Sequence, residues 1–410
     1  MPELFNVVTP EEARRIFYSH LSPNTTLGRV AVADALDRIT RRDVHSPSDL
    51  PAFPRSTMDG YAVRAADTYG ATEGIPAYLN VIGEVLMGRQ SDVTVSAGQA
   101  AIEHTGGMLP AGADAVVMVE NTQQVDAATI EVVRPVAPGE NVIQVGEDLS
   151  RGDLLVPAGH WLRPQDLGGL MGAGVTEIDV APRPVVAVIS TGDEIVPPEA
   201  EIGPGQVRDI NTHTLSAQIR QAGGVPWSLG IIPDNRQALT EAAERALKGA
   251  DVVIITAGSS VSVRDLTAGV ITGLGEPGIL VHGVATRPGK PTILAVAAGK
   301  PVVGLPGNPV SAMVIFDLLV TPALYLLAGC ANPPARSTVE ALLARNVAST
   351  TGREDYVQVR LEERDGQRWA VPIFGESNLI MTMIKADGTV QVPLDKHGLP
   401  EGERVTVTLF

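Results

Sequence analysis

Apolar and polar positions follow different patterns in successive parts of the chain. Between about residues 51 and 139, short apolar segments are separated by Gly, Pro and Asp, which predicts short strands. From residue 183, continuous runs such as 185–189 (VVAVI) and 252–255 (VVII) alternate with helical periods. Runs of this kind are typical of strands buried on both faces. Residues 183–330 therefore predict a three-layer α/β domain with a mostly parallel sheet.

Strict alternation returns beyond residue 330 and predicts a small β domain there. It is clearest in 356–361 (YVQVRL) and 405–409 (VTVTL), where alternate positions are apolar, as in a half-buried strand. The length of 410 residues is compatible with two to four domains at roughly 150 residues each.

Helical periods predict three helices together with their ends. Thr9 and Pro10 suit the first turn of a helix that continues to Tyr18. Two further helices lie within the α/β region, and glycines end both of them. Their apolar faces consist of Leu215, Ile219 and Ala222 in the first, and of Ala238, Leu239, Ala242, Ala243, Ala246 and Leu247 in the second.

One stretch, residues 310–328, is apolar enough to raise the question of a membrane span. Asp317 and the Thr321-Pro322 pair interrupt it, so it falls short of the ~20 clean apolar residues that a span needs. We expect a buried helix instead. The first residues, MPELF, show no targeting pattern. Cys330 is the only cysteine, which excludes disulfides and thiolate clusters and fits a reducing compartment. We therefore expect a cytoplasmic protein with no membrane partner.

The charge balance limits the kinds of ligand that the protein binds. Lys and Arg number 31 against 47 Asp and Glu, a net charge of −16. A general nucleic-acid or membrane-surface binder needs a basic face, so both classes are disfavoured. A small anionic ligand needs only a few well-placed cations and stays possible. The seven histidines show no ligand spacing, which disfavours a histidine-bound metal.

Polar residues follow the buried runs of the α/β region, where such domains bind ligands. Residues 190–194 (STGDE) follow one run, and 233–235 (PDN) follow another; each alone is best explained as a turn or a helix cap. Residues 256–265 contain four hydroxyls and a glycine, so a phosphate loop and an ordinary polar loop are equally favoured. Asn308-Pro309 is explained fully by a helix cap, although the same helix end offers an anion site.

A basic turn, 286–291 (TRPGKP), stands out in this acidic chain. A solvated turn is the default interpretation. However, the prolines fix the backbone and would hold Arg287 and Lys290 in a defined direction, which slightly favours an oxyanion or phosphate ligand. Carboxylates and cations at one sheet edge indicate a divalent cation and a phosphorylated ligand, the combination used to cleave phosphoanhydrides.

Taken in order, six motifs resemble the molybdopterin molybdenumtransferase family, of the MoeA and gephyrin E-domain type. They are residues 56–63 (STMDGYAV), 105–116 (TGGMLPAGADAV), 146–148 (GED), 190–194 (STGDE), 287–291 (RPGKP) and 305–311 (LPGNPVS). Each motif alone is weak, but their shared order extends over essentially the whole chain.

The resemblance implies a four-part homodimer that completes molybdenum cofactor assembly. In that reaction adenylylated molybdopterin is cleaved with Mg²⁺, molybdate is inserted and AMP leaves. The expected parts are a linker domain (1–50 and 140–182), an inserted β-rich domain (51–139), the molybdopterin-binding α/β domain (183–330) and a β-barrel-like C-terminal domain (331–410). A molybdopterin adenylyltransferase and apo-molybdoenzymes are the further protein partners expected.

The resemblance also assigns residues to the site, in a cleft that two subunits share. The catalytic positions are Asp59, Thr105, Asp148, Glu194, Asp234 and Asp265, and the metal ligands are Asp193, Glu194, Asp234 and Asp265. The substrate-binding positions are Thr191, Gly192, Asp193, Gly258, Ser259, Ser260, Ser262, Arg287, Lys290, Pro306, Gly307, Asn308, Ser311, Arg353 and Ser377.

The chain departs from the family pattern in two places. The loop 257–265 (AGSSVSVRD) is one residue shorter than the usual loop and carries Arg264, and Arg287 replaces the usual first lysine of the basic turn. Arginine keeps the charge and can grip an oxyanion with two hydrogen bonds. Two alternatives remain open: a molybdopterin adenylyltransferase, and a non-catalytic molybdopterin-binding scaffold, which the altered loop would favour.

Overall fold

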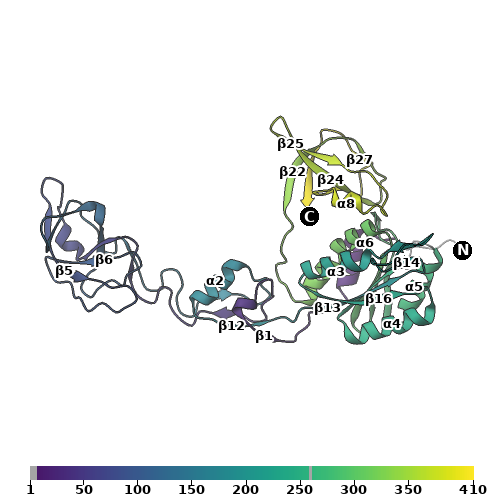
Figure 1. The fold of residues 1–410 in the computed structure, drawn as a ribbon, viewed down its shortest axis with the longest axis horizontal. Helices are drawn as coiled ribbons and strands as arrows, with labels where there is room; N and C mark the ends of the chain where they lie inside the picture. The colour runs from purple at the N-terminus through teal and green to yellow at the C-terminus, as the bar shows by residue number, and fades with distance from the viewer. Residues whose placement is uncertain (1–6, 258–260) are drawn as a thin grey trace.

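The computed structural model describes residues 7–257 and 261–410. The chain is elongated (Figure 1), with a β-rich domain at one end, a small linker domain in the middle, and the α/β domain and C-terminal barrel at the other end. The predicted fold class, a multidomain α/β protein with additional β domains, is confirmed.

The linker domain is built by segments on either side of the inserted domain. Its elements are β1 (Gly28–Ala31), η1 (Val32–Asp34), β2 (Val44–His45), β11 (Leu154–Val156), α2 (Pro164–Gly172) and β12 (Glu177–Val180). Antiparallel pairing of β1 with β12 and of β2 with β11 joins the two halves. Val32, Leu162 and Leu170 lie in its small core.

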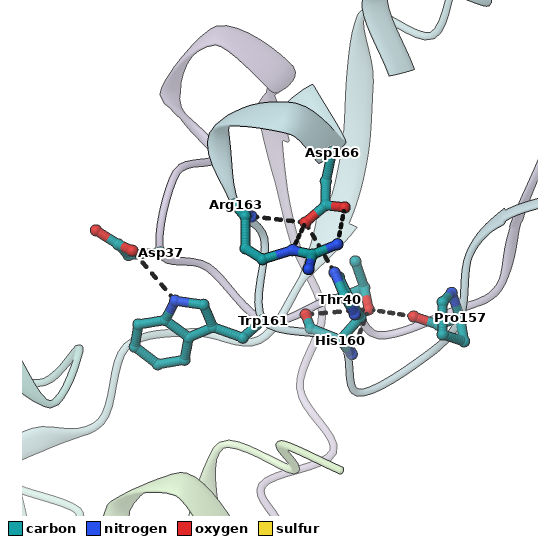
Figure 2. Close-up of polar contacts among 7 residues, drawn as sticks. All are labelled: Asp37, Thr40, Pro157, His160, Trp161, Arg163 and Asp166. Carbon is teal, nitrogen blue, oxygen red and sulfur yellow. Dashed lines mark hydrogen bonds and ion pairs between the residues drawn. The ribbon is translucent and has the colours of Figure 1, made fainter. Parts of the chain in front are cut away.

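Polar contacts set the entry to helix α2 (Figure 2). Asp166 accepts a hydrogen bond from the Arg163 backbone nitrogen at 2.8 Å and another from Arg163 Nε at 2.9 Å. These contacts hold the pKa of Asp166 well below its usual range. The buried Thr40 hydroxyl donates to the Pro157 carbonyl and accepts from the His160 backbone nitrogen. Two remote segments are thus tied together at the start of the helix.

The inserted domain is a six-stranded sheet of order β7-β4-β6-β5-β9-β8. Its elements are β4 (Gly60–Val63), η2 (Ala65–Thr68), β5 (Ala77–Glu84), β6 (Gln99–Glu103), β7 (Ala115–Met118), η3 (Val119–Asn121), β8 (Thr122–Gln124) and β9 (Thr129–Val132). A short pair, β3 (Arg55–Ser56) with β10 (Val142–Ile143), lies where the domain leaves the linker.

Glu103, the last residue of β6, is a buried carboxyl on an inner strand of this sheet. It is 1% exposed, and neither carboxyl oxygen has a hydrogen-bond partner among the described residues. Because burial disfavours the charged form, the pKa of Glu103 is raised to about 7.

The α/β domain has a six-stranded sheet of order β16-β13-β17-β21-β20-β18. The strands are β13 (Val185–Thr191), β16 (Val225–Ile232), β17 (Val252–Ala257), β18 (Pro277–His282), β20 (Ile293–Ala297) and β21 (Lys300–Pro306). The first four in sheet order are mutually parallel, and β20 runs antiparallel to both neighbours. The sequence pattern did not reveal β18, because this edge strand opens with Pro277 and Gly278 and is buried at only two positions.

Helices cover both faces of this sheet, as predicted. They are α1 (Pro10–Tyr18), α3 (Asn211–Gln221), α4 (Arg236–Gly249), α5 (Val261–Gly273), α6 (Pro309–Ile315), the π-helix η4 (Phe316–Val320) and α7 (Thr321–Leu327). Leu215 and Ile219 pack on one face and Leu239 and Ala243 on the other. Helix α1, capped by Thr9 as expected, packs here through Phe17, so the chain enters this domain before it forms the linker. The pair β14 (Ile195–Val196) and β15 (Val207–Arg208) follows β13.

The apolar helix formed by α6, η4 and α7 has the length and composition of a membrane span, with a mean hydropathy of 2.0 over Pro309–Leu327. More than half of it, 56%, is buried inside the protein. Ile315, Phe316 and Leu319 belong to the core against the central sheet. Packing within this domain, as expected from the sequence, therefore accounts for its hydropathy.

The C-terminal domain is a closed barrel in which β24 pairs with both β25 and β26. Its elements are β22 (Thr338–Leu343), β23 (Val347–Ala348), β24 (Glu354–Arg364), β25 (Gln367–Pro372), α8 (Met381–Ile384), β26 (Gly388–Val392), β27 (Gly398–Leu399) and β28 (Arg404–Leu409). A two-residue strand of the α/β domain, β19 (Thr286–Arg287), extends the sheet by pairing with β24.

We predict that Gly289→Ala destabilises the protein by about 2–4 kcal/mol. Gly289 has a φ of 113°, and a Cβ there would lie 2.3 Å from Ile315 Cγ1. The matched control is Gly299→Ala, because Gly299 also has a positive φ, of 73°, but nothing within 4 Å of an added Cβ. Urea unfolding measures both variants. Equal losses of stability would show that the contact with Ile315 adds nothing.

We also predict that Glu103→Gln changes how stability depends on pH. The raised pKa of Glu103 means that its stabilising, neutral form is fully present below pH ~4.5 and is lost as pH rises through about 7. The variant cannot ionise. Its unfolding free energy relative to wild type should therefore rise by on the order of 3 kcal/mol from pH 4 to pH 8. The exposed Glu73→Gln serves as control, and an equal rise there would contradict the prediction.

Candidate functional site

A cavity of about 1000 Å³ lies between the α/β domain and the C-terminal barrel. Its walls come from the basic turn after β19, the end of β21 with the start of α6, and loops of the barrel. Eight of the predicted substrate-binding residues line it: Arg287, Lys290, Pro306, Gly307, Asn308, Ser311, Arg353 and Ser377. Tyr356 and Phe374 add aromatic surface to the wall.

Hydrogen bonds across the domain boundary shape the cavity at the start of α6. Asn308 Nδ2 donates to Ser377 Oγ at 2.8 Å, and the Val310 backbone nitrogen donates to the Ser377 carbonyl at 3.1 Å. Within the α/β domain, the buried Asn211 of α3 donates to the Gly307 carbonyl at 2.8 Å. Asn308 was predicted as a helix cap, but its side chain makes no capping hydrogen bond. It contacts the barrel instead.

The positive charges of the cavity come from two domains and share one carboxylate. Arg353 Nε donates to Asp355 Oδ1 at 2.8 Å, and Arg287 Nη1 lies 3.9 Å from Asp355 Oδ2. Asp355 itself is 3% exposed. Together with Lys290, the two guanidinium groups give the cavity the chemistry of an oxyanion site.

A second group of predicted residues lies at the carboxyl ends of β13 and β16. Thr191 Oγ1 donates to Asp234 Oδ1 at 2.8 Å, and the Asp234 backbone nitrogen donates to Asp193 Oδ1 at 3.1 Å. The Glu194 carboxylate lies beside Gly192, within 2.8 Å of where a Cβ on that glycine would be. The predicted meeting of these two strand ends is therefore present in the structure.

These carboxylates do not form a ready-made metal cage. Within 7–257 and 261–410, no three His, Cys, Asp or Glu side chains are grouped closely enough to hold a metal ion. Asp265, the fourth predicted ligand, lies exposed in helix α5. Mg²⁺ commonly binds to one or two carboxylates, several waters and the phosphates of a substrate. The Asp193–Asp234 pair has the donor chemistry for that mode of binding and lacks the chemistry of a structural metal site.

A third group, Asp59 and Thr105, lies in the inserted domain. The backbone nitrogen and hydroxyl of Thr105 donate to Asp59 Oδ1 at 2.8 and 3.0 Å, and these bonds hold the pKa of Asp59 below its usual range. Beside them, His104 Nε2 lies 2.8 Å from Glu84 Oε1, a hydrogen bond that raises the pKa of His104. Figure 1 places this domain at the opposite end of the chain from the cavity.

The remaining predicted residues are placed apart or lie outside the description. Asp148 is in the linker region, where its backbone nitrogen donates to the Leu50 carbonyl. Gly258, Ser259 and Ser260 lie outside the described residues, and for Ser262 only the backbone, in α5, is described. The roles given to all the predicted site residues stay predictions.

Sequence reasoning missed Asp355 and Asn211. Asp355 stands in an alternating strand next to Glu354, where a carboxylate is ordinarily solvated, and only the pairing of β19 with β24 brings Arg287 to it. The one available signal was its position two residues after Arg353. Asn211 begins a predicted helix and gave no signal, because its partner at Gly307 is remote in sequence.

Three family models match successive parts of the chain. The MoeA N-terminal region (domain I and II) matches residues 8–174, a probable molybdopterin binding domain matches 187–325, and the MoeA C-terminal region (domain IV) matches 340–410. The molybdopterin molybdenumtransferase of Nostoc sp. is 35% identical over 90% of this chain and 86% of its own. The enzyme of that name from Bacillus subtilis is 31% identical over 98% and 93%.

Solved structures agree with these sequence matches. A molybdopterin biosynthesis MoeA protein from Pyrococcus horikoshii has 40% sequence identity and a TM-score of 0.82, with 98% of this chain and 99% of that chain covered. Another MoeA structure from the same organism has 29% identity and a TM-score of 0.86. The chain, with its cationic cavity between the second and third matched regions, belongs to the molybdopterin molybdenumtransferase (MoeA) family of molybdenum cofactor biosynthesis.

Proposed function

We propose that this protein inserts molybdate into adenylylated molybdopterin and releases AMP, the last step of molybdenum cofactor assembly. The observation that carries the proposal is the convergence of Arg287, Lys290 and Arg353 on one cavity in a chain of net charge −16. Molybdate is a tetrahedral dianion, and arginine forks and a lysine are the groups that bind such ions. The cavity volume of about 1000 Å³ leaves room for a second, larger anionic substrate beside it.

Residues of both domains would bind and orient the two substrates. Arg287, Lys290 and Arg353 hold molybdate, while Asn308, Ser311 and Ser377 offer neutral polar groups to the oxygens of either substrate. The rings of Tyr356 and Phe374 suit the flat pterin. Holding both reactants in one cavity lowers the entropic cost of bringing them together.

Mg²⁺ is proposed to bind next to the pyrophosphate of the substrate. Asp193 and Asp234 would hold it, with Glu194 close by, because carboxylates are the ligands that Mg²⁺ prefers. In the contacts among Thr191, Asp193 and Asp234, each of the two aspartates accepts a hydrogen bond through its Oδ1. When bound, the ion would neutralise charge as the phosphoanhydride bond breaks. Thr191 orients Asp234 through its hydroxyl, and the Asp234 backbone orients Asp193.

A homodimer is proposed as the working unit. Asp59 and Thr105 lie in the domain at the far end of the chain (Figure 1), so one chain does not bring them to its own cavity. A second copy arranged around a two-fold axis could supply them. The ionised Asp59, fixed by Thr105, would then act in the partner's cleft. In the cytoplasm, an adenylylating enzyme would supply the substrate and apo-molybdoenzymes would receive the product.

We predict that Lys290→Gln lowers molybdate-dependent AMP release about 10²-fold, the loss typical of one oxyanion-binding group. The full-length protein is incubated with adenylylated molybdopterin, Mg²⁺ and molybdate, and AMP is followed by chromatography. Lys248→Gln, on the exposed end of α4, is the control and should release AMP as the wild type does. If the wild type instead consumes ATP with bare molybdopterin, the protein is an adenylyltransferase. If it binds the substrate without turnover, it is a scaffold.

The dimer is tested by subunit mixing. Asp59→Asn and Lys290→Gln proteins, each inactive alone, are denatured together and refolded. If the cleft is shared, hybrid dimers hold one intact site, and random pairing restores about a quarter of wild-type AMP release. Each variant refolded alone provides the control. A mixture that stays as inactive as its parents, although hybrids form by mass spectrometry, would contradict the shared cleft.

A further inference from the structure

We propose that Asp355 is a positioning residue that holds the guanidinium groups of Arg287 and Arg353 in the cavity and makes a single oxyanion site from two domains. The inference deepens the proposed function and rests on it in one respect only, namely that the cavity binds an oxyanion. It assigns a role to a residue that the sequence motifs passed over.

The contacts of Asp355 use both of its carboxyl oxygens. Arg353 Nε donates to Oδ1 at 2.8 Å and Arg353 Nη2 donates to Oδ2 at 3.3 Å, which is the two-point geometry of an arginine fork. Arg287 Nη1 lies 3.9 Å from the same Oδ2. One carboxylate therefore fixes the plane of one guanidinium group and attracts the other.

The carboxylate of this cluster is buried, while the two arginines that it contacts are more exposed. The Asp355 side chain is 5% exposed, whereas the side chains of Arg353 and Arg287 are 34% and 61% exposed. A buried carboxylate has little freedom to move, while a largely exposed arginine without a partner samples many rotamers. Asp355 thus restricts the rotamers that the side chains of Arg287 and Arg353 sample.

The backbone places Asp355 at the domain boundary. Arg287 of β19 pairs in parallel register with Asp355 of β24. This pairing joins a strand of the α/β domain to the sheet of the barrel. The ion pair of Arg287 with Asp355 extends the same junction to the side chains, so the arrangement of the two domains and the arrangement of the two cations are coupled.

Positioning and simple charge predict opposite results when Asp355 is neutralised. A carboxylate beside an anion site repels the anion, so its removal alone should tighten oxyanion binding. If Asp355 orients the two arginines, its removal leaves them disordered in the free protein. Binding must then order them at an entropic cost, so the affinity for the oxyanion falls. In metal sites, the residues that orient the direct ligands typically contribute ten- to a hundred-fold in affinity, and we expect the lower end of that range here.

The test is calorimetric binding of molybdate, with sulfate as a second probe, to the full-length protein. We expect Asp355→Asn to weaken both by about tenfold and to raise the KM for molybdate while kcat at saturating molybdate is retained. Glu362→Gln is the matched control, because Glu362 lies on the same strand and also pairs with two arginines, Arg360 and Arg364, but does not line the cavity. It should bind as the wild type does.

A second variant keeps the proposal testable if Asp355→Asn does not fold. Arg353→Lys keeps the charge but cannot form the fork with Asp355, so it should lose affinity for both anions to a similar extent. Unchanged or tighter binding by Asp355→Asn, wild-type binding by Arg353→Lys, or a wild type that binds neither anion would each overturn the inference. A wild type that binds both anions but releases no AMP would overturn the proposed function alone.

Discussion

The pairing of β19 with β24 is the constraint on which the cavity depends. Two residues of the α/β domain, Thr286 and Arg287, align with Glu354 and Asp355 of the barrel. Without this junction the barrel would be joined to the α/β domain mainly by the chain leaving α7 and by contacts at the start of α6. With it, the basic turn on one side and Arg353 on the other face a common space. The cluster of positive charges that lines the cavity is therefore a property of the interface, and neither domain carries it alone.

The positions of the predicted site residues also depend on how the domains are arranged along the whole chain. Most of the predicted residues form three separate groups: the cavity, the ends of β13 and β16, and the Asp59–Thr105 contact. The first lies between the α/β domain and the barrel, and the second lies in the α/β domain. The third lies in the domain at the other end of an elongated molecule (Figure 1). Linker segments such as those around Thr40 and Asp166 are held by hydrogen bonds (Figure 2), so the separation reflects an ordered linker. This separation is the physical argument for a second subunit.

Sequence reasoning succeeded where a local rule decides the outcome. Continuous apolar runs identified β13 and β17, since strands buried on both faces admit little else, and Thr9 capped α1 as its hydroxyl predicts. It failed where a remote contact decides. Asn308 stands at the N-cap of α6 as expected, but its side chain makes no capping hydrogen bond, and its Nδ2 donates to Ser377 Oγ of the barrel. Strand β18 was missed because an edge strand has a neighbouring strand on one side only and does not need a continuous buried run. The two-residue β19 is too short to show a period.

The pairing of charges in the cavity, like the elements missed from the sequence, depends on contacts between residues that are remote along the chain. In a chain of net charge −16, a cation that binds an anionic substrate must be protected from its many possible carboxylate partners. The cavity does this by using one buried carboxylate, Asp355, for two arginines, so positive charge remains after the pairing. A count of charges along the sequence cannot show that two arginines share one carboxylate, because the junction between the two domains determines which charges meet. The arrangement of positive charge in the cavity therefore depends on the geometry of Arg287, Arg353 and Asp355. That geometry follows from the pairing of Thr286 and Arg287 with Glu354 and Asp355.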